Sequence, residues 1–268
     1  SNFENTMTKM ERCLQYTKLI SEKAQETKKD KEYSAWPSKG KIEFVDYSVK
    51  YRPETEIVLK NINFTLNPGE HLGIVGRTGS GKSTISLCLF RILEATTGKI
   101  LIDDVDISTL GLKKLRNGIT IIPQDATLMT GTLKYNIDPL GKYTDSEIIE
   151  VMRKIGFYYI LKNHERGLEQ NIVENGGNLS IGEKQLICIT RAILRKSKIV
   201  IMDEATSSID YKTEMLIQNS INLSLKYSTV ITIAHRIKTI INYDRIFVLS
   251  EGELVECGAP SALIKHGK

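Results

Sequence analysis

The sequence predicts an α/β fold built on a mostly parallel β-sheet, with a small antiparallel β layer before it and an inserted helical subdomain. One observation behind this is a glycine-rich loop at residues 76–83 between an apolar run and a helical pattern, which is the order of strand, loop and helix that a phosphate-binding loop requires. The other is the alternation of short β-branched runs with helical patterns later in the chain, which is typical of parallel sheets.

Length and composition fit one large α/β domain with an appendage. The 268 residues carry a net charge of +5, but the lysines are scattered and do not interleave with aromatic residues, which argues against a nucleic-acid surface. No apolar run approaches the roughly eighteen residues that span a bilayer, so a membrane partner must come from outside this chain. The four widely spaced cysteines fit reduced thiols in a cytosolic setting. Because the chain begins with Ser, we expect it to be a piece of a longer polypeptide.

The first 35 residues are expected to be a tail and linker ahead of the main domain. Apolar residues step by three and four through residues 3–24, which predicts an amphipathic helix. Such a helix either joins the domain to a preceding element or packs on its own domain, and the sequence leaves both open. A charged linker is predicted at residues 25–33, and the turn at 36–40 marks the start of a domain that we place at residues 36–268.

Strand-like runs then follow in order. Residues 42–47 and 57–66 predict the antiparallel layer ahead of the phosphate loop. The later predicted strands are residues 99–102, 119–122, 199–202, 230–234 and 245–249, with a hairpin return at 251–255 and a short final helix. A polar helical pattern, clearest at residues 143–155, predicts an inserted helical lobe over about residues 125–185.

The phosphate loop reads Gly-x-x-x-x-Gly-Lys-Ser. Its glycines let backbone N–H groups turn toward one point, where they and the start of the next helix can hold phosphate oxygens. Lys82 is predicted to reach the β- and γ-phosphates, and Ser83 to offer its hydroxyl to Mg²⁺. A glycine-rich turn that carries a lysine by chance is the weaker alternative. The predicted nucleotide-binding residues of this segment are Gly76, Arg77, Thr78, Gly79, Ser80, Gly81, Lys82, Ser83 and Thr84.

A second nucleotide motif ends the strand-like run at residues 199–202 with Asp203 and Glu204. Because neighbouring side chains on a strand point to opposite faces, adjacent carboxylates can serve one site only where the strand ends, and Ala-Thr-Ser-Ser ends it here. Asp203 is predicted to hold Mg²⁺, and Glu204 to orient or deprotonate the water that attacks the γ-phosphate. Two solvated carboxylates at a strand end are the structural alternative.

Three further residues gain meaning from their positions. Gln124 and His235 are uninformative alone, yet both fall just past the ends of predicted strands, as Gly76 and Asp203 do, and this is the edge where open parallel sheets bind ligands. We predict that Gln124 senses metal and nucleotide and that His235 contacts the γ-phosphate or the attacking water. Tyr51 is predicted to stack on the base, the alternative being a surface strand tyrosine.

The segment at residues 179–185 opens a helix, and it has an ordinary structural explanation. Ser180-x-x-Glu183 is a capping box, in which each side chain bonds the other residue's backbone N–H. No nucleotide is needed to account for this pair.

Taken together and in this order, these motifs resemble the ATP-binding cassette (ABC) family. The resemblance covers about residues 36–268 and is carried by the phosphate loop, Gln124, residues 179–185, residues 199–204, residues 208–210 and His235. Longer phrases, such as Tyr-Arg-Pro at 51–53 and Ile-Ile-Pro-Gln-Asp at 121–125, are similar to the second nucleotide-binding domain of the multidrug-resistance-associated (C subfamily) full transporters.

This resemblance implies a P-loop NTPase of the ABC type that binds ATP with Mg²⁺ and hydrolyses it. It also implies two cassettes that sandwich two ATP molecules head to tail, so that Ser180 and Gly182 would serve the partner domain's ATP. Ile181 stands where the consensus has Gly and Glu183 where it has Gln, which predicts slow hydrolysis at that half-site. Residues 1–35 would lead out of a membrane domain, with the ABC domain at the cytoplasmic face.

The leading hypothesis is therefore an ATP-hydrolysing motor domain that powers export across a membrane as part of an ABC full transporter. Its expected partners are a second nucleotide-binding domain and the transmembrane domains of the same polypeptide, with no nucleic acid. A nucleotide-gated regulatory domain of an ABC-type channel or receptor, and a soluble ABC ATPase, stay open as alternatives. We expect weak ATPase activity from the isolated chain, and the transported substrate does not follow from the sequence.

Overall fold

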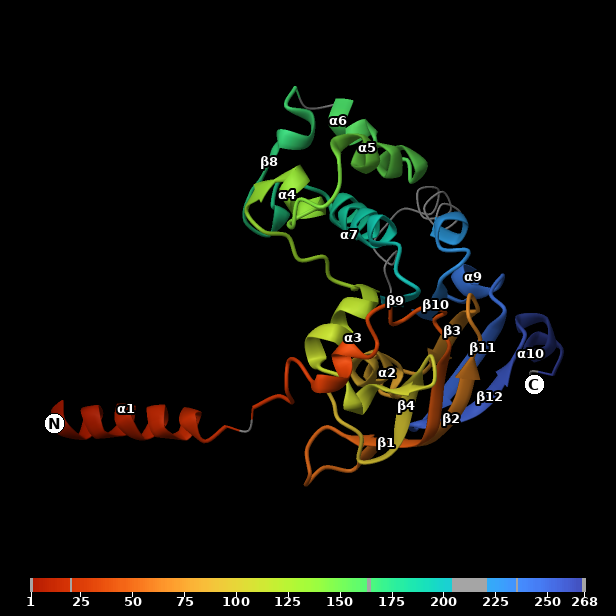
Figure 1. The fold of residues 1–268 in the computed structure, drawn as a ribbon. Coiled ribbons are helices and arrows are strands. Elements are labelled where there is room, and N and C mark those ends of the chain that lie inside the picture. The colour runs from red at the N-terminus through yellow and green to blue at the C-terminus, as the bar shows by residue number, and fades with distance from the viewer. Residues whose placement is uncertain (1, 20, 163–164, 204–220, 235, 267–268) are drawn as a thin grey trace.

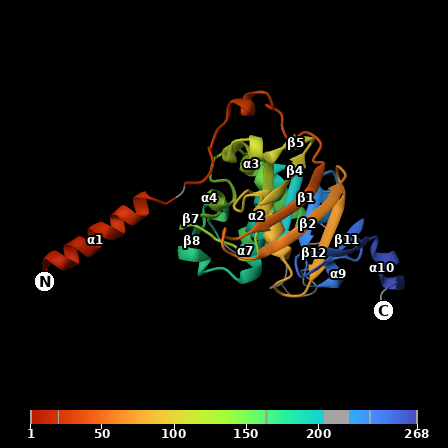
Figure 2. The same ribbon diagram turned by 90° about the horizontal axis from the view of Figure 1, so that it is seen from below.

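The computed structural model describes residues 2–19, 21–162, 165–203, 221–234 and 236–266. Figure 1 shows a body of β-strands with a lobe of helices on one side of it. Helix α1 (Asn2–Thr17) extends away from this body in both views (Figures 1 and 2). Its side chains are exposed from residue 5 onward, Met10 by 61% and Leu14 by 54%. Of the two alternatives for this helix, packing on its own domain is therefore not observed in the described residues.

Two sheets form the body. The antiparallel sheet has the order β2-β1-β4-β5, and the six-stranded sheet has the order β12-β11-β3-β10-β9-β6, parallel except for β12. The antiparallel strands are β1 (Ile42–Lys50), β2 (Ile57–Leu66), β4 (Thr97–Ile102) and β5 (Val105–Asp106). The others are β3 (His71–Gly76), β6 (Ile119–Ile122), β9 (Ile199–Asp203), β10 (Thr229–Ile233), β11 (Arg245–Ser250) and β12 (Glu253–Gly258). The predicted antiparallel layer, the mostly parallel sheet and the hairpin return are confirmed.

Helices occupy the connections and the lobe. Those that pack around the sheets are α2 (Lys82–Leu89), α3 (Leu112–Gly118), α9 (Ile237–Ile240) and α10 (Pro260–His266). The lobe contains α4 (Leu133–Ile137), α5 (Asp145–Lys154), α6 (Tyr159–Lys162), α7 (Ile181–Arg195) and the strand pair β7 (Gly131–Thr132) and β8 (Asn171–Ile172). Short 3-10 turns are η1 (Lys28–Lys31), η2 (Ile107–Thr109), η3 (Gly167–Glu169) and η4 (Glu174–Gly176). We propose the lobe as a helical subdomain, from which α7 leads back to the sheet.

Strand β9 shows how both faces of the six-stranded sheet are filled. Ile199 and Ile201 belong to a core shared with α2 and the antiparallel sheet, whereas Val200 and Met202 belong to a core shared with α7 and the lobe. This alternation follows from the two-residue period of a strand, and burial on both faces is typical of a central parallel strand. Helix α2 is therefore held in the core between the two sheets, which fixes the loop that precedes it.

Residues 21–41, here called the N-terminal strap, are bound to α3. Glu22 pairs with Arg116 through two hydrogen bonds of 2.7 and 3.1 Å, and Glu26 pairs with Lys113 at 3.0 Å. Arg116 Nε also donates to the carbonyl oxygen of Phe90, at the end of α2. The segment predicted as a charged linker is thus bound to the surface of the domain and does not extend into solvent.

The far end of the strap is held by one carboxylate. The side chain of Asp103, in the turn between β4 and β5, accepts hydrogen bonds from the four backbone N–H groups of residues 38–41, at 2.7 to 2.9 Å. Just before them, Trp36 Nε1 donates to the carbonyl oxygen of Ile102 at 2.9 Å. Asp103 has a positive φ of 50°, which aspartate tolerates better than most residues. This turn therefore anchors the strap where it enters β1.

Candidate functional site

The phosphate loop joins β3 to α2 at one edge of the six-stranded sheet. Lys82, the first residue of α2, is 6% exposed, and its Nζ donates to the carbonyl oxygens of Gly76 (2.9 Å) and Arg77 (3.0 Å). The lysine therefore reaches back over its own loop and holds it in a curve. The next residue, Ser83, is exposed, as a hydroxyl that is to meet a ligand must be.

Close packing against other segments explains two of the loop's glycines. A Cβ atom at Gly76 would lie 2.3 Å from the carbonyl oxygen of Leu249, and one at Gly81 would lie 2.7 Å from Cδ2 of Leu59. The buried hydroxyl of Ser80 has no hydrogen-bond partner in the described part of the chain. An unpaired buried hydroxyl costs free energy, and a phosphate oxygen brought into the loop would supply a partner. The loop therefore fits the ligand that its sequence predicts.

Tyr51 lies beside the start of α2. It follows the last residue of β1, is 49% exposed, and its hydroxyl lies 3.1 Å from Oγ1 of Thr84. This contact joins residues 33 positions apart and leaves about half of the tyrosine surface open to solvent beside the phosphate loop. The position suits stacking on a base, which stays a prediction.

Backbone register brings predicted site residues to one edge of the sheet. Ile233 at the end of β10 pairs with Ile74 of β3 on one side and with Asp203 of β9 on the other. Gly76 comes two residues after Ile74, and Gln124 comes two residues after β6, which is the neighbour of β9. The strand ends thus align at the carboxyl edge, where open α/β sheets bind ligands.

Helix α7 holds the backbone of the segment after β6. Gln185 Nε2 donates to the carbonyl oxygen of Gln124 and, at 3.4 Å, to that of Pro123. Gln185 is 2% exposed, and its Oε1 has no hydrogen-bond partner among the residues that the structure describes. Sequence reasoning assigned this glutamine no role, because nothing in its neighbours along the chain reveals a contact to a loop some sixty residues away.

Ser180 is the N-cap residue of α7, and the predicted capping box is confirmed. Its backbone N–H and its hydroxyl both donate to Oε2 of Glu183, each at 2.8 Å, and its Oγ accepts from the N–H of Glu183 at 3.2 Å. Ile181 is 60% exposed, and Gly182 follows it in the first turn of the helix. This end of α7 therefore presents an exposed surface, and its role toward a nucleotide stays a prediction.

Two predicted catalytic residues lie outside the described residues. These are Glu204 and His235, together with residues 208–210 of the family resemblance. Their roles stay predictions from the sequence.

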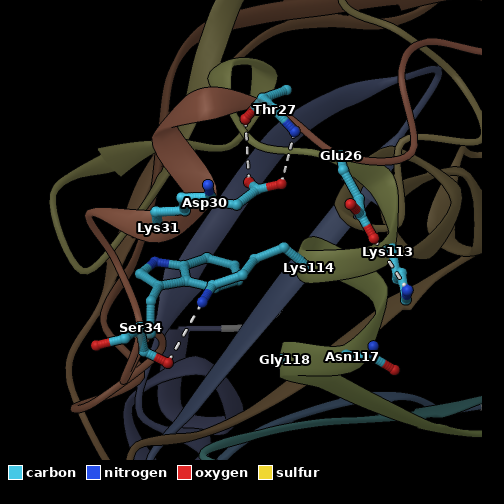
Figure 3. A pocket seen from close by; sticks show the side chains of 10 residues that line it. Glu26, Thr27, Asp30, Lys31, Ser34, Lys113, Lys114, Asn117 and Gly118 are labelled. Carbon is cyan, nitrogen blue, oxygen red and sulfur yellow. Dashed lines mark hydrogen bonds and ion pairs between the residues drawn. The ribbon is translucent and has the colours of Figure 1, made fainter.

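A pocket of about 430 Å³ lies between the N-terminal strap and α3, and none of its lining residues belongs to the phosphate loop (Figure 3). Figure 3 shows that its charged groups are largely engaged with one another or with the backbone. Glu26 pairs with Lys113, Asp30 accepts from the backbone and hydroxyl of Thr27, and Lys114 Nζ donates to a backbone carbonyl of the strap. We therefore interpret this pocket as a consequence of strap packing.

The described residues limit which metal sites and which reactive thiols this domain can contain. Among them, no group of three or more His, Cys, Asp or Glu side chains is placed to hold a metal ion. Mg²⁺ does not need such a cage, because it is commonly held by one or two side chains together with substrate phosphates. Burial raises the pKa of the Cys88 thiol in α2 to about 12, so this group stays protonated near neutral pH and is no nucleophile. The four cysteines are free.

The sequence profile of the ABC transporter family matches residues 59–207, a segment that includes the phosphate loop, Gln124 and α7. The chain belongs to the ABC transporter family. The nucleotide-binding domains of this family bind and hydrolyse ATP, so the chain is a nucleotide-binding ATPase domain of that type.

Individual ABC proteins agree with this assignment. The chain is 46% identical over 265 residues to ATP-binding cassette sub-family C member 2 of Homo sapiens, and the aligned segment makes up 99% of this chain and 17% of the relative. It is 49% identical over 229 residues to ABC transporter C family member 13 of Dictyostelium discoideum, and this alignment covers 85% of the present chain and 17% of the relative. A solved bacterial Atm1-family ABC exporter with ATP bound superposes with a TM-score of 0.82 at 31% identity, over 86% of this chain and 41% of that one.

These matches confirm the predicted ABC fold and the likeness to the C subfamily. The chain spans 17% of the length of these two curated ABC relatives. In the described part of the chain, no helix combines the length and the apolar character that crossing a bilayer requires.

Proposed function

We propose that this chain is the motor domain of an ABC full transporter, binding and hydrolysing ATP to power export of substrates across a membrane. The observation that carries the proposal is the phosphate loop with Lys82 folded over it, at a sheet edge that Gln124 and Asp203 also reach. The names of an ABC transporter of the C family and of an ABC exporter among the relatives support this function over the channel, receptor and soluble alternatives.

The residues of the loop divide the work of holding ATP. Lys82 Nζ would exchange its two backbone carbonyl partners for oxygens of the β- and γ-phosphates, a change that needs no large movement because the amine already lies over the loop. The remaining contacts would come from the N–H groups of residues 77–81 and the start of α2. Tyr51 would cover the base, with its hydroxyl held on Thr84.

Magnesium would be held by Ser83, Gln124 and Asp203 together with the phosphates, and it would neutralise charge on the β- and γ-phosphates. Ser83 and Gln124 are exposed and Asp203 is half-buried, so all three side chains have access to solvent and ligand. Glu204 would orient the attacking water or take its proton, while His235 would contact the γ-phosphate or that water. No covalent intermediate on the protein is required.

We propose two kinds of partner, a second nucleotide-binding domain and transmembrane domains. Ser180 and Gly182 lie at the exposed start of α7, where they would face the ATP of a second nucleotide-binding domain. Residues 1–35 would connect the ABC domain at residues 36–268 to transmembrane domains of the same polypeptide. The domain would then work at the cytoplasmic face of a membrane.

The test uses the parent polypeptide reconstituted in lipid vesicles. Glu204→Gln should leave ATP affinity within about twofold and lower the hydrolysis rate at least a hundredfold, because the general base is lost while the phosphate loop is intact. Glu150→Gln, an exposed carboxylate on α5 whose pKa is lowered by Lys154, is the matched control and should change neither value. Unchanged turnover in Glu204→Gln would remove that residue from its role, and a parent protein that binds no ATP would overturn the proposed function.

A further inference from the structure

We propose that the turn between β11 and β12 positions the phosphate loop, with Gly252 as the positioning residue. This inference rests on one part of the proposed function, namely that the loop binds phosphates. The turn lies about 170 residues after the loop in sequence, but β11 is a direct neighbour of β3, so the two segments meet at the same edge of the sheet.

Gly252 bridges the phosphate loop and the antiparallel sheet through its backbone. Its N–H donates to the carbonyl oxygen of Ser80 at 3.2 Å, and its own carbonyl oxygen accepts from the N–H of Lys60 at 2.8 Å. Lys60 belongs to β2, so the loop is tied to the second sheet through a single residue. Because these are backbone groups, their geometry is set by the fold and not by side-chain rotamers.

The conformation of the turn is demanding. Ser250 pairs with Glu253, which leaves a two-residue turn whose members Glu251 and Gly252 both have positive φ values, +50° and +82°. This is the pattern of a type I′ hairpin turn, which favours Asn and Gly and is unfavourable for Glu. A Cβ atom at Gly252 would also lie 2.1 Å from the carbonyl oxygen of Val58. The turn is therefore closely fitted against β2, and only glycine fits at its second position.

The consequence for phosphate binding follows from peptide geometry. In a planar trans peptide, the C=O of Ser80 and the N–H of Gly81 point in opposite directions. The C=O points back to Gly252, so the N–H of Gly81 points away from the turn. Gly81 is the N-cap residue of α2, where backbone N–H groups are the donors that bind an anion. The turn thus fixes the orientation of one of the loop's phosphate-binding donors.

The same hairpin also supports the other end of the loop. The carbonyl oxygen of Leu249 in β11 lies 2.3 Å from where a Cβ atom of Gly76 would be, so the loop packs against β11 where it leaves β3 and against Gly252 before it enters α2. The hairpin therefore contacts both ends of the loop.

Paired glycine substitutions test this. Gly252→Ala should force the turn away from β2 and weaken ATP binding about tenfold, the effect expected when one oriented hydrogen bond is lost. Gly156→Ala is the matched control, because Gly156 has a similar φ of +73° but no atom within 4 Å of an added Cβ. It should lower the thermal midpoint through backbone strain alone and leave ATP affinity within twofold.

A second measurement needs no substitution, so it still tests whether the turn positions the phosphate loop if Gly252→Ala does not fold. In the unaltered protein, inorganic tripolyphosphate should shift the amide proton resonance of Gly81 and slow hydrogen exchange of the Gly252 amide, with no effect on Gly156. The inference is overturned if Gly252→Ala folds and keeps full ATP affinity, or if exchange at Gly252 ignores the bound polyphosphate. A protein that binds neither ATP nor tripolyphosphate would instead overturn the proposed function.

Discussion

One carboxylate determines what the start of α7 offers to an incoming phosphate. Glu183 takes up both donors of Ser180, the backbone N–H and the hydroxyl, and places a negative charge beside the helix N-terminus. These bonds stabilise the helix as a capping box, but an approaching anion would need the same donors. At the residue scale, helix capping and the proposed binding of a partner's ATP therefore compete for one serine.

We expect Glu183→Gln to separate these two effects. Glutamine also completes a capping box, so the thermal midpoint should change by less than about 2 °C. Removal of the charge should raise the ATP turnover of the reconstituted parent protein by roughly threefold to tenfold, measured at saturating ATP. Glu150→Gln removes a surface carboxylate elsewhere and should leave turnover unchanged. Equal or slower turnover in a stable Glu183→Gln protein would show that the charge does not restrain this half-site.

At the scale of elements, the N-terminal strap and α3 form one unit. The carboxylate of Asp30 accepts from the N–H of Gly111 at the start of α3 and from the N–H and hydroxyl of Thr27. Burial acts to raise the pKa of Asp30, but these hydrogen bonds outweigh it and hold the pKa below its ordinary value. A carboxylate with a lowered folded pKa stabilises the folded state above its unfolded pKa, and this contribution is lost as the pH falls through the folded pKa.

Acid should therefore release the strap. Trp36 is the single tryptophan of the chain and donates its indole N–H to Ile102, so its fluorescence reports on strap docking. We expect constant emission above about pH 4 and a shift to longer wavelength below it.

The Asp30→Asn protein should show shifted emission already at neutral pH and a much weaker dependence on pH. The Glu150→Gln protein loses a different carboxylate with a lowered pKa and should follow the unaltered profile. An Asp30→Asn profile that matches the unaltered protein would contradict the role of Asp30.

At the scale of the whole molecule, the N-terminal residues divide into two parts with different roles. Helix α1 extends away from the body, with side chains exposed from residue 5 onward, whereas the strap is tied to α3, to the β4–β5 turn and through Arg116 to the end of α2. We therefore propose that the strap belongs structurally with the ABC domain and that α1 is the part that would contact another segment.

Truncation tests this division. A chain that begins at residue 21 should keep its thermal midpoint within about 2 °C, because α1 buries little against the domain. A chain that begins at residue 36 should melt roughly 5–10 °C lower, because it loses the bonds of Glu22, Glu26 and Asp30 to α3. Differential scanning calorimetry of the full chain and the two truncated chains measures these midpoints. Equal midpoints would mean that the strap adds no stability.

Local pattern was sufficient for most elements of this chain. The bounds predicted for β2 and β6 match the structure, and the capping box at Ser180 was readable because its two residues are three positions apart. The strand at residues 99–102 was also predicted, but its place in the antiparallel sheet beside β1 depends on pairing across nearly sixty residues. Gln185 and Gly252 could not be found in this way, because each acts through backbone groups of a distant segment.

The sequence by itself determined that this chain folds around a phosphate loop, because spacing within a few residues encodes the loop, its helix and the ends of the strands beside it. Tertiary structure decided what surrounds that loop. The alignment of Asp203 with Gly76 depends on sheet register, and the support from Gly252 depends on β11 lying next to β3. Such contacts are fixed only when buried strands pack, since hydrogen bonds between distant backbone groups leave no pattern in the side chains.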